Sequence, residues 1–422
     1  MAKAFSLIAC HDCGLLHRER PLPDGAAAKC TRCGAVLYKA RRNSLDRTLM
    51  LSLAALIFFV LANVFPFMTF KMEGRAQEST LITGVMELYD ADLWPLAVVV
   101  FCGSILLPLV KVLSMLAVLL PLKLGRRPRH LAAVFRLVEI LHPWAMMEVY
   151  LLGVFVAYVK LIDLATIELG VALYSFVALI VLLAAADASL DPRVVWERLK
   201  TAPRVARLPA KWRTTLVGCH ACDLVSRLRR PPKGGHMHCP RCGTALHRRK
   251  ANSLARTWAL LLTAAILYIP ANVFPVMTVI SFGKGAPDTI LSGVKHLVEG
   301  GMWPLALLVF FASITVPVLK LIGLSYLLIS VQRKSQWRPR DRTRLYRITE
   351  AVGRWSMIDI FMISILVALV KLGSIATIEP GVGATSFAAV VIITMIAAMS
   401  FDPRLIWDNM ESEHERTTPR AA

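Results

Sequence analysis

Charged side chains are scarce in this sequence, and acidic ones are scarcer than basic ones. Asp, Glu, Lys and Arg supply 18% of the 422 residues, whereas 56% of the residues are hydrophobic. This composition excludes a disordered or collagen-like chain, and apolar runs of about 20 residues leave no room for a large aqueous catalytic domain. For that reason we expect the protein not to be an enzyme. The sequence also lacks a G-x4-G-K-[ST] loop, so we expect no ATP hydrolysis by that route.

Basic residues outnumber acidic ones by 49 to 28, which gives a formal net charge of +21. Such a charge is compatible with nucleic-acid binding, but the Lys and Arg residues cluster next to the apolar runs. At those positions they meet the anionic headgroups of a lipid bilayer. The sequence therefore favours a multi-pass membrane protein without a nucleic-acid partner.

The chain is an internal duplication. Residues 10–111 recur at a shift of 209, and residues 136–196 recur at a shift of 211. The cysteine pairs, the strings ANVFP and WP, the spacing P-x-x-K and the ending DPR-x-x-W all occur twice in the same order. A shift of one whole unit predicts two parallel modules, each with a small cysteine domain followed by a helix bundle.

The apolar runs predict an all-α polytopic membrane protein with eight transmembrane helices, four in each module. The expected helices cover residues 49–70, 93–122, 138–162, 171–188, 257–281, 303–331, 350–373 and 383–401. The predicted order of domains is a zinc ribbon at 1–48, a transmembrane module at 49–190, an interfacial linker at 191–213, a second ribbon at 214–256, a second module at 257–402 and a cytoplasmic tail at 403–422.

The short segments that flank the predicted helices set the orientation. Twenty Lys or Arg residues lie in segments 39–48, 123–136, 248–256 and 332–347, whereas four lie in 71–92, 163–170, 283–300 and 372–382. Because Lys and Arg accumulate in cytoplasmic loops, both termini and both cysteine domains are predicted to face the cytoplasm. A polar stretch with four cysteines precedes the first apolar run, so we expect no cleavable signal peptide.

Three repeated motifs predict features at the helix ends. Trp94 and Trp303 precede a proline in a first helical turn and suit the membrane interface away from the cytoplasm. Each DPR motif is typical of an Asp-capped interfacial helix, anchored by Trp196 or Trp407. ANVFP places a helix-breaking proline near the end of each first helix, where either a hinge or a packing kink satisfied by the Asn amide is compatible with the sequence.

Eight of the nine cysteines form four Cys-x2-Cys pairs. Each module begins with Cys-x2-Cys-x16-Cys-x2-Cys, which places four thiolates on two turns as tetrahedral Zn2+ requires. Because four sulfur ligands leave no open coordination position, the sequence predicts two structural zinc ions per chain. A rubredoxin-like iron, a dithiol redox role or histidine ligation are the alternatives. The predicted ligands are Cys10, Cys13, Cys30, Cys33, Cys219, Cys222, Cys239 and Cys242, and the flanking histidines are His11, His220, His236 and His238.

A lysine lies inside the second predicted helix of each module. Lys320 is about 20 Å from either end of its helix at 1.5 Å per residue, which places it near mid-depth. Ser313 lies on the same helical face, and Pro317 lacks the N–H that would bond the Ser313 carbonyl. We therefore expect the lysine, the hydroxyl and the freed carbonyl to converge. Ser104 and Lys111 occupy the same places in the first module.

Ionisable groups in hydrocarbon are costly, so they are expected to face the bundle interior and to pair. Acids on the following helices predict the pairs Lys111 with Glu148 and Lys320 with Asp359. The competing interpretation is that the lysines snorkel and the acids only support packing. The predicted transport network comprises Ser313, Lys320, Ser356, Asp359, Thr394, Lys111, Glu148 and Ser104. Secondary positions are Lys160, Asp163, Ser364 and Lys371. The two secondary lysines lie near helix ends, where they are expected to snorkel to the membrane interface.

The doubled set of motifs resembles the paraquat-inducible protein A (PqiA and LetA) family of bacterial inner-membrane proteins. The motifs are two four-cysteine ribbons, each followed by NS-L-x-R-T, ANVFP-x-MT, a helix that starts with WP and contains P-x-x-K, and DPR-x-x-W. The resemblance covers about residues 8–408. It implies zinc at the eight cysteines, four-helix bundles similar to those of tetraspanins, and exchange of lipids with a periplasmic MCE-domain tunnel protein.

Three functions stay open on the sequence alone. The first is a membrane subunit that passes phospholipids to or from such a tunnel. The second is a zinc-stabilised membrane anchor or assembly platform without a transport cycle of its own. The third is a membrane redox protein that uses the Cys-x2-Cys pairs, which bound iron or reversible disulfides would favour.

Overall fold

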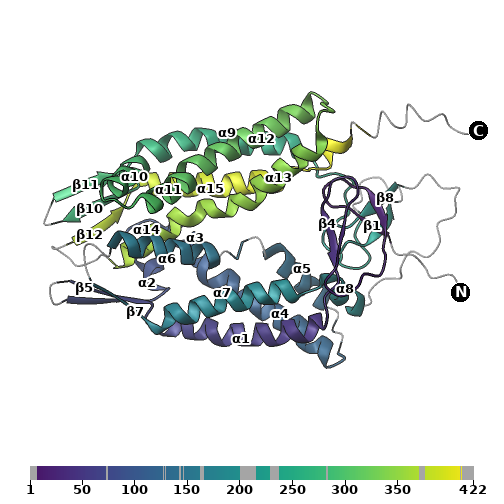
Figure 1. Ribbon diagram of the computed structural model, residues 1–422, viewed down its shortest axis with the longest axis horizontal. Coiled ribbons are helices and arrows are strands. Elements are labelled where there is room, and N and C mark those ends of the chain that lie inside the picture. Colours follow the sequence, from purple (N-terminus) through teal and green to yellow (C-terminus); the bar gives the residue numbers. More distant parts are fainter. Residues whose placement is uncertain are drawn as a thin grey trace, which may run out of the picture.

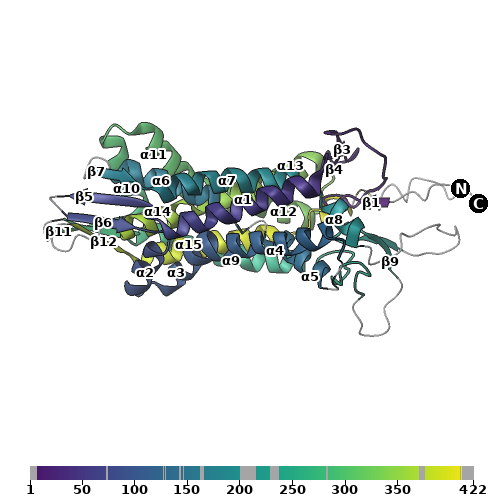
Figure 2. The ribbon, with the colours of Figure 1, turned by 90° about the horizontal axis from the view of Figure 1, so that it is seen from below.

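The computed structural model describes residues 7–72, 75–126, 128, 130–141, 144–145, 147–161, 166–199, 215–228, 237–281, 284–369, 376–408 and 410. Two helical modules lie side by side along the long axis of the molecule (Figure 1). The ribbon strands lie at one end of both modules, and two small sheets lie at the opposite end (Figures 1 and 2). The predicted architecture, mostly helical and duplicated with two four-cysteine ribbons, is confirmed.

The two modules contain the same series of helices. Module 1 consists of α1 (Ser44–Val64), α2 (Thr83–Asp90), α3 (Trp94–Phe101), the π-helical segment η1 (Cys102–Leu106), α4 (Leu107–Lys123), α5 (Leu131–Leu141), α6 (Met147–Leu161), α7 (Val171–Ser189) and α8 (Pro192–Leu199). Module 2 consists of α9 (Ser253–Val273), α10 (Ile290–Glu299), α11 (Trp303–Phe310), the π-helical segment η2 (Phe311–Thr315), α12 (Val316–Gln332), α13 (Pro339–Gly353), the 3-10 turn η3 (Arg354–Met357), α14 (Ile358–Leu369) and α15 (Val382–Ser400).

Six helices in the described ranges are long and apolar enough to cross a membrane, where the sequence predicts eight. They are Ser44–Val64, Trp94–Lys123, Val171–Ser189, Ser253–Val273, Trp303–Gln332 and Val382–Asp408. The third predicted helix of each module is divided instead. In module 1, α5 ends two residues before Pro143, as the conformational restriction before a proline requires. In module 2, η3 interrupts the run between α13 and α14.

Two antiparallel sheets, which the sequence analysis missed, cap the end opposite the ribbons. Their strands are β5 (Met68–Met72), β6 (Arg75–Ser79), β7 (Thr166–Leu169), β10 (Met277–Ser281), β11 (Lys284–Asp288) and β12 (Ala376–Pro380), in the orders β6-β5-β7 and β11-β10-β12. The helices predicted to reach residues 70 and 281 therefore end early, at Val64 and Val273. The proline of each ANVFP string ends the helix, and the chain continues as a strand.

The ANVFP strings pack tightly against the start of the last helix in each module. The Asn63 amide donates to the Phe59 carbonyl at 2.8 Å, one turn earlier on the same helix. A Cβ on Gly170 would lie 2.1 Å from the Pro66 carbonyl oxygen, and one on Gly381 would lie 2.2 Å from the Pro275 oxygen. Only glycine allows this approach, so both turns are close-packed junctions.

Each ribbon packs against the module of the other repeat. Ribbon 1 contains β1 (Leu7–Ala9), β2 (Leu16–Arg18), β3 (Ala27–Lys29) and β4 (Val36–Lys39), and ribbon 2 contains β8 (Thr215–Gly218), β9 (Val225–Leu228) and residues 237–246. The cysteines of ribbon 1 share a buried cluster with side chains of α12, α13 and α15 in module 2. Those of ribbon 2 share one with α4, α5 and α8 in module 1. Each ribbon thus covers the module that it does not precede.

The tryptophans of the DPR motifs are part of these clusters. Trp196 and Trp407 are 2% and 3% exposed, so the prediction that they anchor in lipid headgroups is wrong. Trp196 meets Phe135 edge to face at 5.1 Å, and Trp407 Nε1 donates to Thr343 at 3.0 Å. The helix predicted after the first DPR is present as α8.

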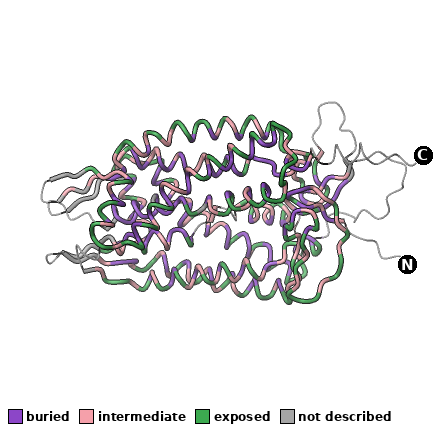
Figure 3. The backbone as a smooth tube through the Cα atoms, turned by 45° about the horizontal axis from the view of Figure 1, so that its top comes forward, coloured by how far each residue is buried: buried purple, intermediate pink, exposed green. Residues whose placement is uncertain are grey.

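The modules contact each other mainly through α6 and α14, and α14 also packs on α2. Tyr150 and Phe361 meet there with ring centroids 5.2 Å apart. A Cβ on Gly153 would lie 3.0 Å from Phe361 Cβ and 3.1 Å from the Met362 backbone nitrogen. Buried residues run along this interior, while exposed ones lie on the outer helix faces (Figure 3).

Substitution of Gly153 tests this interface. We expect Gly153→Val to destabilise the protein by about 1 to 3 kcal/mol, because the added methyls overlap the α14 backbone. Thermal unfolding in detergent measures the loss. The control is Phe155→Leu on the same helix, which is 56% exposed and is expected to leave the midpoint unchanged. Equal midpoints for both variants would contradict the packing described.

Candidate functional site

The four cysteines of each ribbon converge on one point. In ribbon 1, Sγ of Cys10 lies 3.5 Å from that of Cys33, and Sγ of Cys13 lies 3.5 Å from that of Cys30. In ribbon 2, the corresponding distances are 3.5 and 3.4 Å. All four sulfurs in each group lie within 4.8 Å of one another and are buried. These two groups are candidate metal centres.

Tight turns give the sulfurs this arrangement. The Gly14 N–H donates to the Cys10 carbonyl at 2.9 Å, and Gly34 does the same to Cys30. Positive φ angles of 76° and 74° at these glycines let the chain double back. In ribbon 2 one of the two turns uses Asp223, at φ 55°, in place of glycine.

The donor set fits a tetrahedral metal ion. Zn–S bonds of about 2.3 Å at tetrahedral angles put the sulfurs about 3.8 Å apart, close to the observed separations. Within ribbon 2, hydrogen bonds from Cys219 and Cys222 lower the pKa of the Cys242 thiol below its ordinary value, whereas the pKa values of Cys219 and Cys222 are raised, so the clustered thiols share protons in the absence of metal. The histidines in the described ranges are not part of either group. His236 lies outside the described residues. His17, which the sequence analysis did not single out, places Nε2 3.3 Å from Cys30 Sγ.

The second candidate site is the buried amine of Lys320. Its Nζ donates to Thr394 Oγ1 at 2.8 Å and lies 3.5 Å from the Gly353 carbonyl oxygen. Lys320 is 2% exposed, and Thr394 is fully buried. Among the side chains that the structure describes, no carboxylate bonds to this amine. An ammonium ion in such surroundings is incompletely compensated.

The depth of this amine in a membrane stays a prediction. Thr394 lies six residues before the end of α15 at Ser400, about 9 Å along the helix. Lys320 lies 12 residues before the end of its own helix at Gln332, about 18 Å.

The other predicted members of the network lie on adjacent elements. Segment η3, which contains Ser356, contacts η2, which contains Ser313. The Ser313 hydroxyl donates to the Val309 carbonyl at 2.7 Å, so it does not converge with the lysine as predicted. The hydroxyls of Ser356 and Ser364 are buried without a hydrogen-bond partner in the described part of the chain.

Four predicted positions lie outside what the structure describes. Asp163 and Lys371 fall outside the described residues. Lys160 and Asp359 lie on α6 and α14, but their side chains are not described. The pair Lys320 with Asp359 therefore stays a prediction.

In module 1 the charge of the buried lysine is paired with a carboxylate. Lys111 Nζ lies 2.7 Å from Asp187 Oδ2 on α7, and Glu148 is exposed, so the predicted partner of Lys111 was wrong. Under the shift of 211, Thr394 corresponds to Leu183, one helical turn before Asp187. In both modules the last helix therefore supplies the partner. An isolated acid in the apolar run 171–189 was the signal that sequence reasoning overlooked.

Both lysine helices contain a π-helical segment that the sequence analysis also missed. It covers Cys102–Leu106 in module 1 and Phe311–Thr315 in module 2. The prolines at 108 and 317 lack the N–H for a regular turn, and Ser104 donates to the Val100 carbonyl at 2.8 Å. Such segments are frequent at functional sites.

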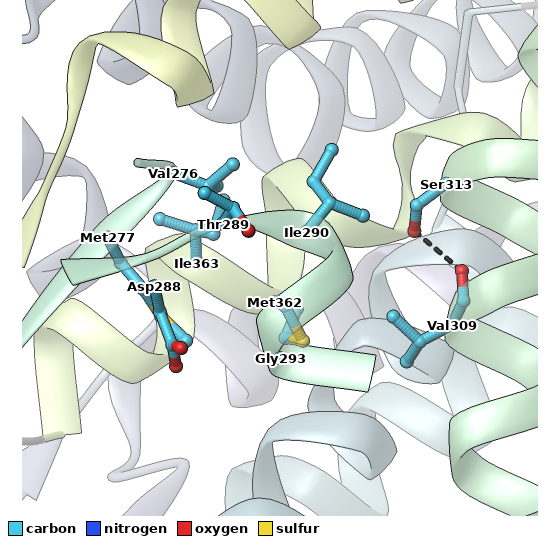
Figure 4. Close-up of a pocket in the computed structure, with 10 residues that line it drawn as sticks. All are labelled: Val276, Met277, Asp288, Thr289, Ile290, Gly293, Val309, Ser313, Met362 and Ile363. Carbon is cyan, nitrogen blue, oxygen red and sulfur yellow. Dashed lines mark hydrogen bonds between the residues drawn. The ribbon is translucent and has the colours of Figure 1, made fainter. Parts of the chain in front are cut away.

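A small pocket adjoins η2 near the sheet end of module 2. Its walls include Asp288, Thr289, Val309, Ser313 and Met362 (Figure 4). Its volume of about 30 Å3 accommodates water but not an acyl chain. Its lining is largely apolar, apart from the Asp288 carboxylate and the two hydroxyls.

These features define a class: a duplicated helical membrane protein with two four-cysteine ribbons and buried lysines within its bundles. The family model described as "Paraquat-inducible protein A" matches residues 45–200 and 254–411. The chain belongs to this family, as its motifs indicated.

Relatives that match this chain over nearly its full length support the same family assignment. The chain is 36% identical over 417 residues to "Intermembrane transport protein PqiA" of Escherichia coli (strain K12), covering 97% of this chain and 98% of the relative. It is 33% identical over 408 residues to "Lipophilic envelope-spanning tunnel protein A" of the same organism, covering 96% and 92%. It is 28% identical over 413 residues to "Probable intermembrane transport protein" of Haemophilus influenzae, covering 97% of each. No solved structure matches the chain.

Metal analysis tests the ribbons. We expect two tightly bound metal ions per purified chain, falling to one in Cys13→Ser, because a ligand is lost from one cluster only. Elemental analysis by mass spectrometry gives the count, and Cys102→Ser, outside both clusters, is the control. Iron in place of zinc, or disulfides that form and break reversibly, would support the redox alternative instead.

A double-mutant cycle tests the ion pair of module 1. Lys111→Met alone is expected to cost about 3 kcal/mol of stability, because it leaves the Asp187 carboxylate without its cation. The double variant Lys111→Met with Asp187→Leu is expected to recover most of that loss. Denaturant unfolding measures each value. Additive losses would show that the two groups are not coupled.

Proposed function

We propose that this chain is the membrane subunit of an intermembrane lipid transport system. In this role it resides in the bacterial inner membrane, with both ribbons and both termini in the cytoplasm. It passes phospholipids to or from a periplasmic MCE-domain tunnel protein. The single observation that carries the proposal is the buried amine of Lys320, in a chain 36% identical to an intermembrane transport protein.

The chemistry of the amine suits a phospholipid headgroup. An ammonium ion in an apolar bundle forms a strong, charge-assisted hydrogen bond with a phosphate oxygen. Thr394 and the Gly353 carbonyl hold the amine in place when no headgroup is present. A phosphate would supply the negative charge that the described surroundings lack. Module 1 already neutralises Lys111 with Asp187, so module 2 is the proposed working half and module 1 the scaffold.

The metal centres support this function structurally. Four buried sulfurs complete the coordination of a tetrahedral metal ion. We propose that this ion is zinc in both ribbons. A closed site of this kind stabilises the ribbon and carries out no chemistry. The residues that hold the metal are the eight cysteines of the two Cys-x2-Cys-x16-Cys-x2-Cys sets.

A specific observation favours the second candidate, an anchor or assembly platform. The described pocket beside Ser313 is too small for an acyl chain. The transport proposal therefore requires module 2 to open. The platform requires no such change, and under it the lysines would be inert.

Substitution of the buried lysine distinguishes the transport function from the platform function. The assay follows fluorescent phospholipid leaving proteoliposomes that contain this chain and its tunnel partner. Lys320→Met is expected to slow transfer at least about tenfold, because one hydrogen bond to a charged headgroup is worth about 1.5 to 3 kcal/mol. Lys295→Met, at an exposed lysine of α10, is the control and is expected to retain the normal rate.

Folding is checked in the same samples. Because no carboxylate among the described side chains bonds to Lys320, its replacement is not expected to lower stability, so Lys320→Met should unfold at or above the normal midpoint. Normal transfer by a well-folded Lys320→Met would refute the transport role of this site and leave the platform.

A further inference from the structure

Arg347 on α13 of module 2 binds the metal turn of ribbon 1, more than 300 positions away in the sequence. Its Nε donates to Asp12 Oδ2 at 2.6 Å. Its Nη2 lies 3.2 Å from the Cys33 carbonyl oxygen and 3.4 Å from Cys33 Sγ. Asp12 is 4% exposed. One guanidinium therefore contacts a metal ligand and the acid beside another ligand.

Further contacts hold ribbon 1 on the same surface. Arg340 donates to the backbone carbonyls of Arg32 and Thr31 at 2.7 and 3.1 Å. The Arg32 guanidinium lies 4.7 Å from the ring centroid of Trp407, which is fixed in turn by Thr343. The second turn of the ribbon is thereby attached to both α13 and the end of the module.

The contact between an arginine of one module and the ribbon of the other repeat occurs twice. Arg136 on α5 of module 1 corresponds to Arg347 under the shift of 211, and Cys242 corresponds to Cys33 under the shift of 209. Arg136 Nη1 lies 3.4 Å from the Cys242 carbonyl oxygen. The same arginine therefore reaches the same cysteine carbonyl of the opposite ribbon in both halves.

The two ribbons also contact each other at equivalent positions. Gly218 corresponds to Ala9, and a Cβ on Gly218 would lie only 2.6 Å from Ala9 Cβ. The ribbons are therefore in close contact where β1 meets β8. Ribbon 1 is also held by its own module, because Arg193 of α8 lies 3.3 Å from Glu19. It therefore contacts its own module through Arg193, the opposite module through Arg347, and the other ribbon here.

Helix α13 connects this contact to the buried amine. Arg347 lies six residues before Gly353, about 9 Å along the helix. The Gly353 carbonyl faces Lys320 Nζ at 3.5 Å. A displacement of α13 at the ribbon end would therefore change the surroundings of the amine.

We propose that each metal-bound ribbon clamps the opposite module, and that the metal of ribbon 1 holds α13 in position through Arg347. The metal fixes the Cys33 turn, and the turn fixes the guanidinium. The clamp does not depend on what the protein transports. It interlocks the two halves at the ribbon end, where α5 and α13 would otherwise have one face unsupported.

Hydrogen exchange on the full-length protein in nanodiscs tests the crossed arrangement. In Cys30→Ser with Cys33→Ser, amides of Pro339–Gly353 are expected to exchange about tenfold faster or more, while those of Leu131–Leu141 keep their rates. Cys239→Ser with Cys242→Ser is expected to give the reverse pattern. Faster exchange in the module that directly follows the altered ribbon, or equal effects in both modules, would overturn the proposal.

A variant that keeps every cysteine covers the case in which a ribbon fails to fold. Arg347→Ala is expected to release one of the two metals to a chelator about tenfold faster and to loosen α13, because it removes the hydrogen bonds behind a ligand. The matched control is Arg344→Ala, exposed on the same helix, which is expected to release both metals at the normal rate. Unchanged release and exchange in Arg347→Ala would contradict the clamp.

Discussion

The cost of a charge inside an apolar bundle is the constraint on which the account of this protein depends. Module 1 meets that cost by pairing Lys111 with Asp187. Module 2 keeps the lysine and buries its amine almost completely, and among the described side chains the partner on the last helix is the hydroxyl of Thr394, with no carboxylate bonded to the amine. This difference between the halves supports the proposal that module 2 is the half that accepts an anion.

The ribbons connect the two modules at one end of the molecule. Because each ribbon packs on the module that it does not precede, the modules cannot separate at that end without disturbing a metal turn. At the other end they meet through α6 and α14, where Gly153 allows backbone contact. Segment η3, beside the buried amine, also contacts α6 of module 1.

The sequence predicted features that depend on spacing and periodicity. The four-cysteine sets, the duplication and the long apolar helices follow from residue types at fixed intervals, and the described residues contain both cysteine sets and six of the eight predicted long helices. It did not predict features that depend on tertiary contacts. The partner of Lys111 lies 76 residues away, and the isolated acid Asp187 signals a buried charge but not which lysine it meets. The crossed ribbons likewise follow from which surfaces meet, since the motifs of the two halves are equivalent. The strands after ANVFP were overlooked because the helix-ending effect of proline was read as a kink.

Photo-crosslinking beside the amine shows whether a phospholipid reaches Lys320. A photoreactive residue at Met395, which is 5% exposed and adjoins Gly353, samples the interior, while one at Ile322, 60% exposed on α12, samples the surrounding bilayer. The account predicts phospholipid adducts at both positions, with those at Met395 lost when Lys320 is replaced by Met. Adducts at Ile322 alone would contradict it.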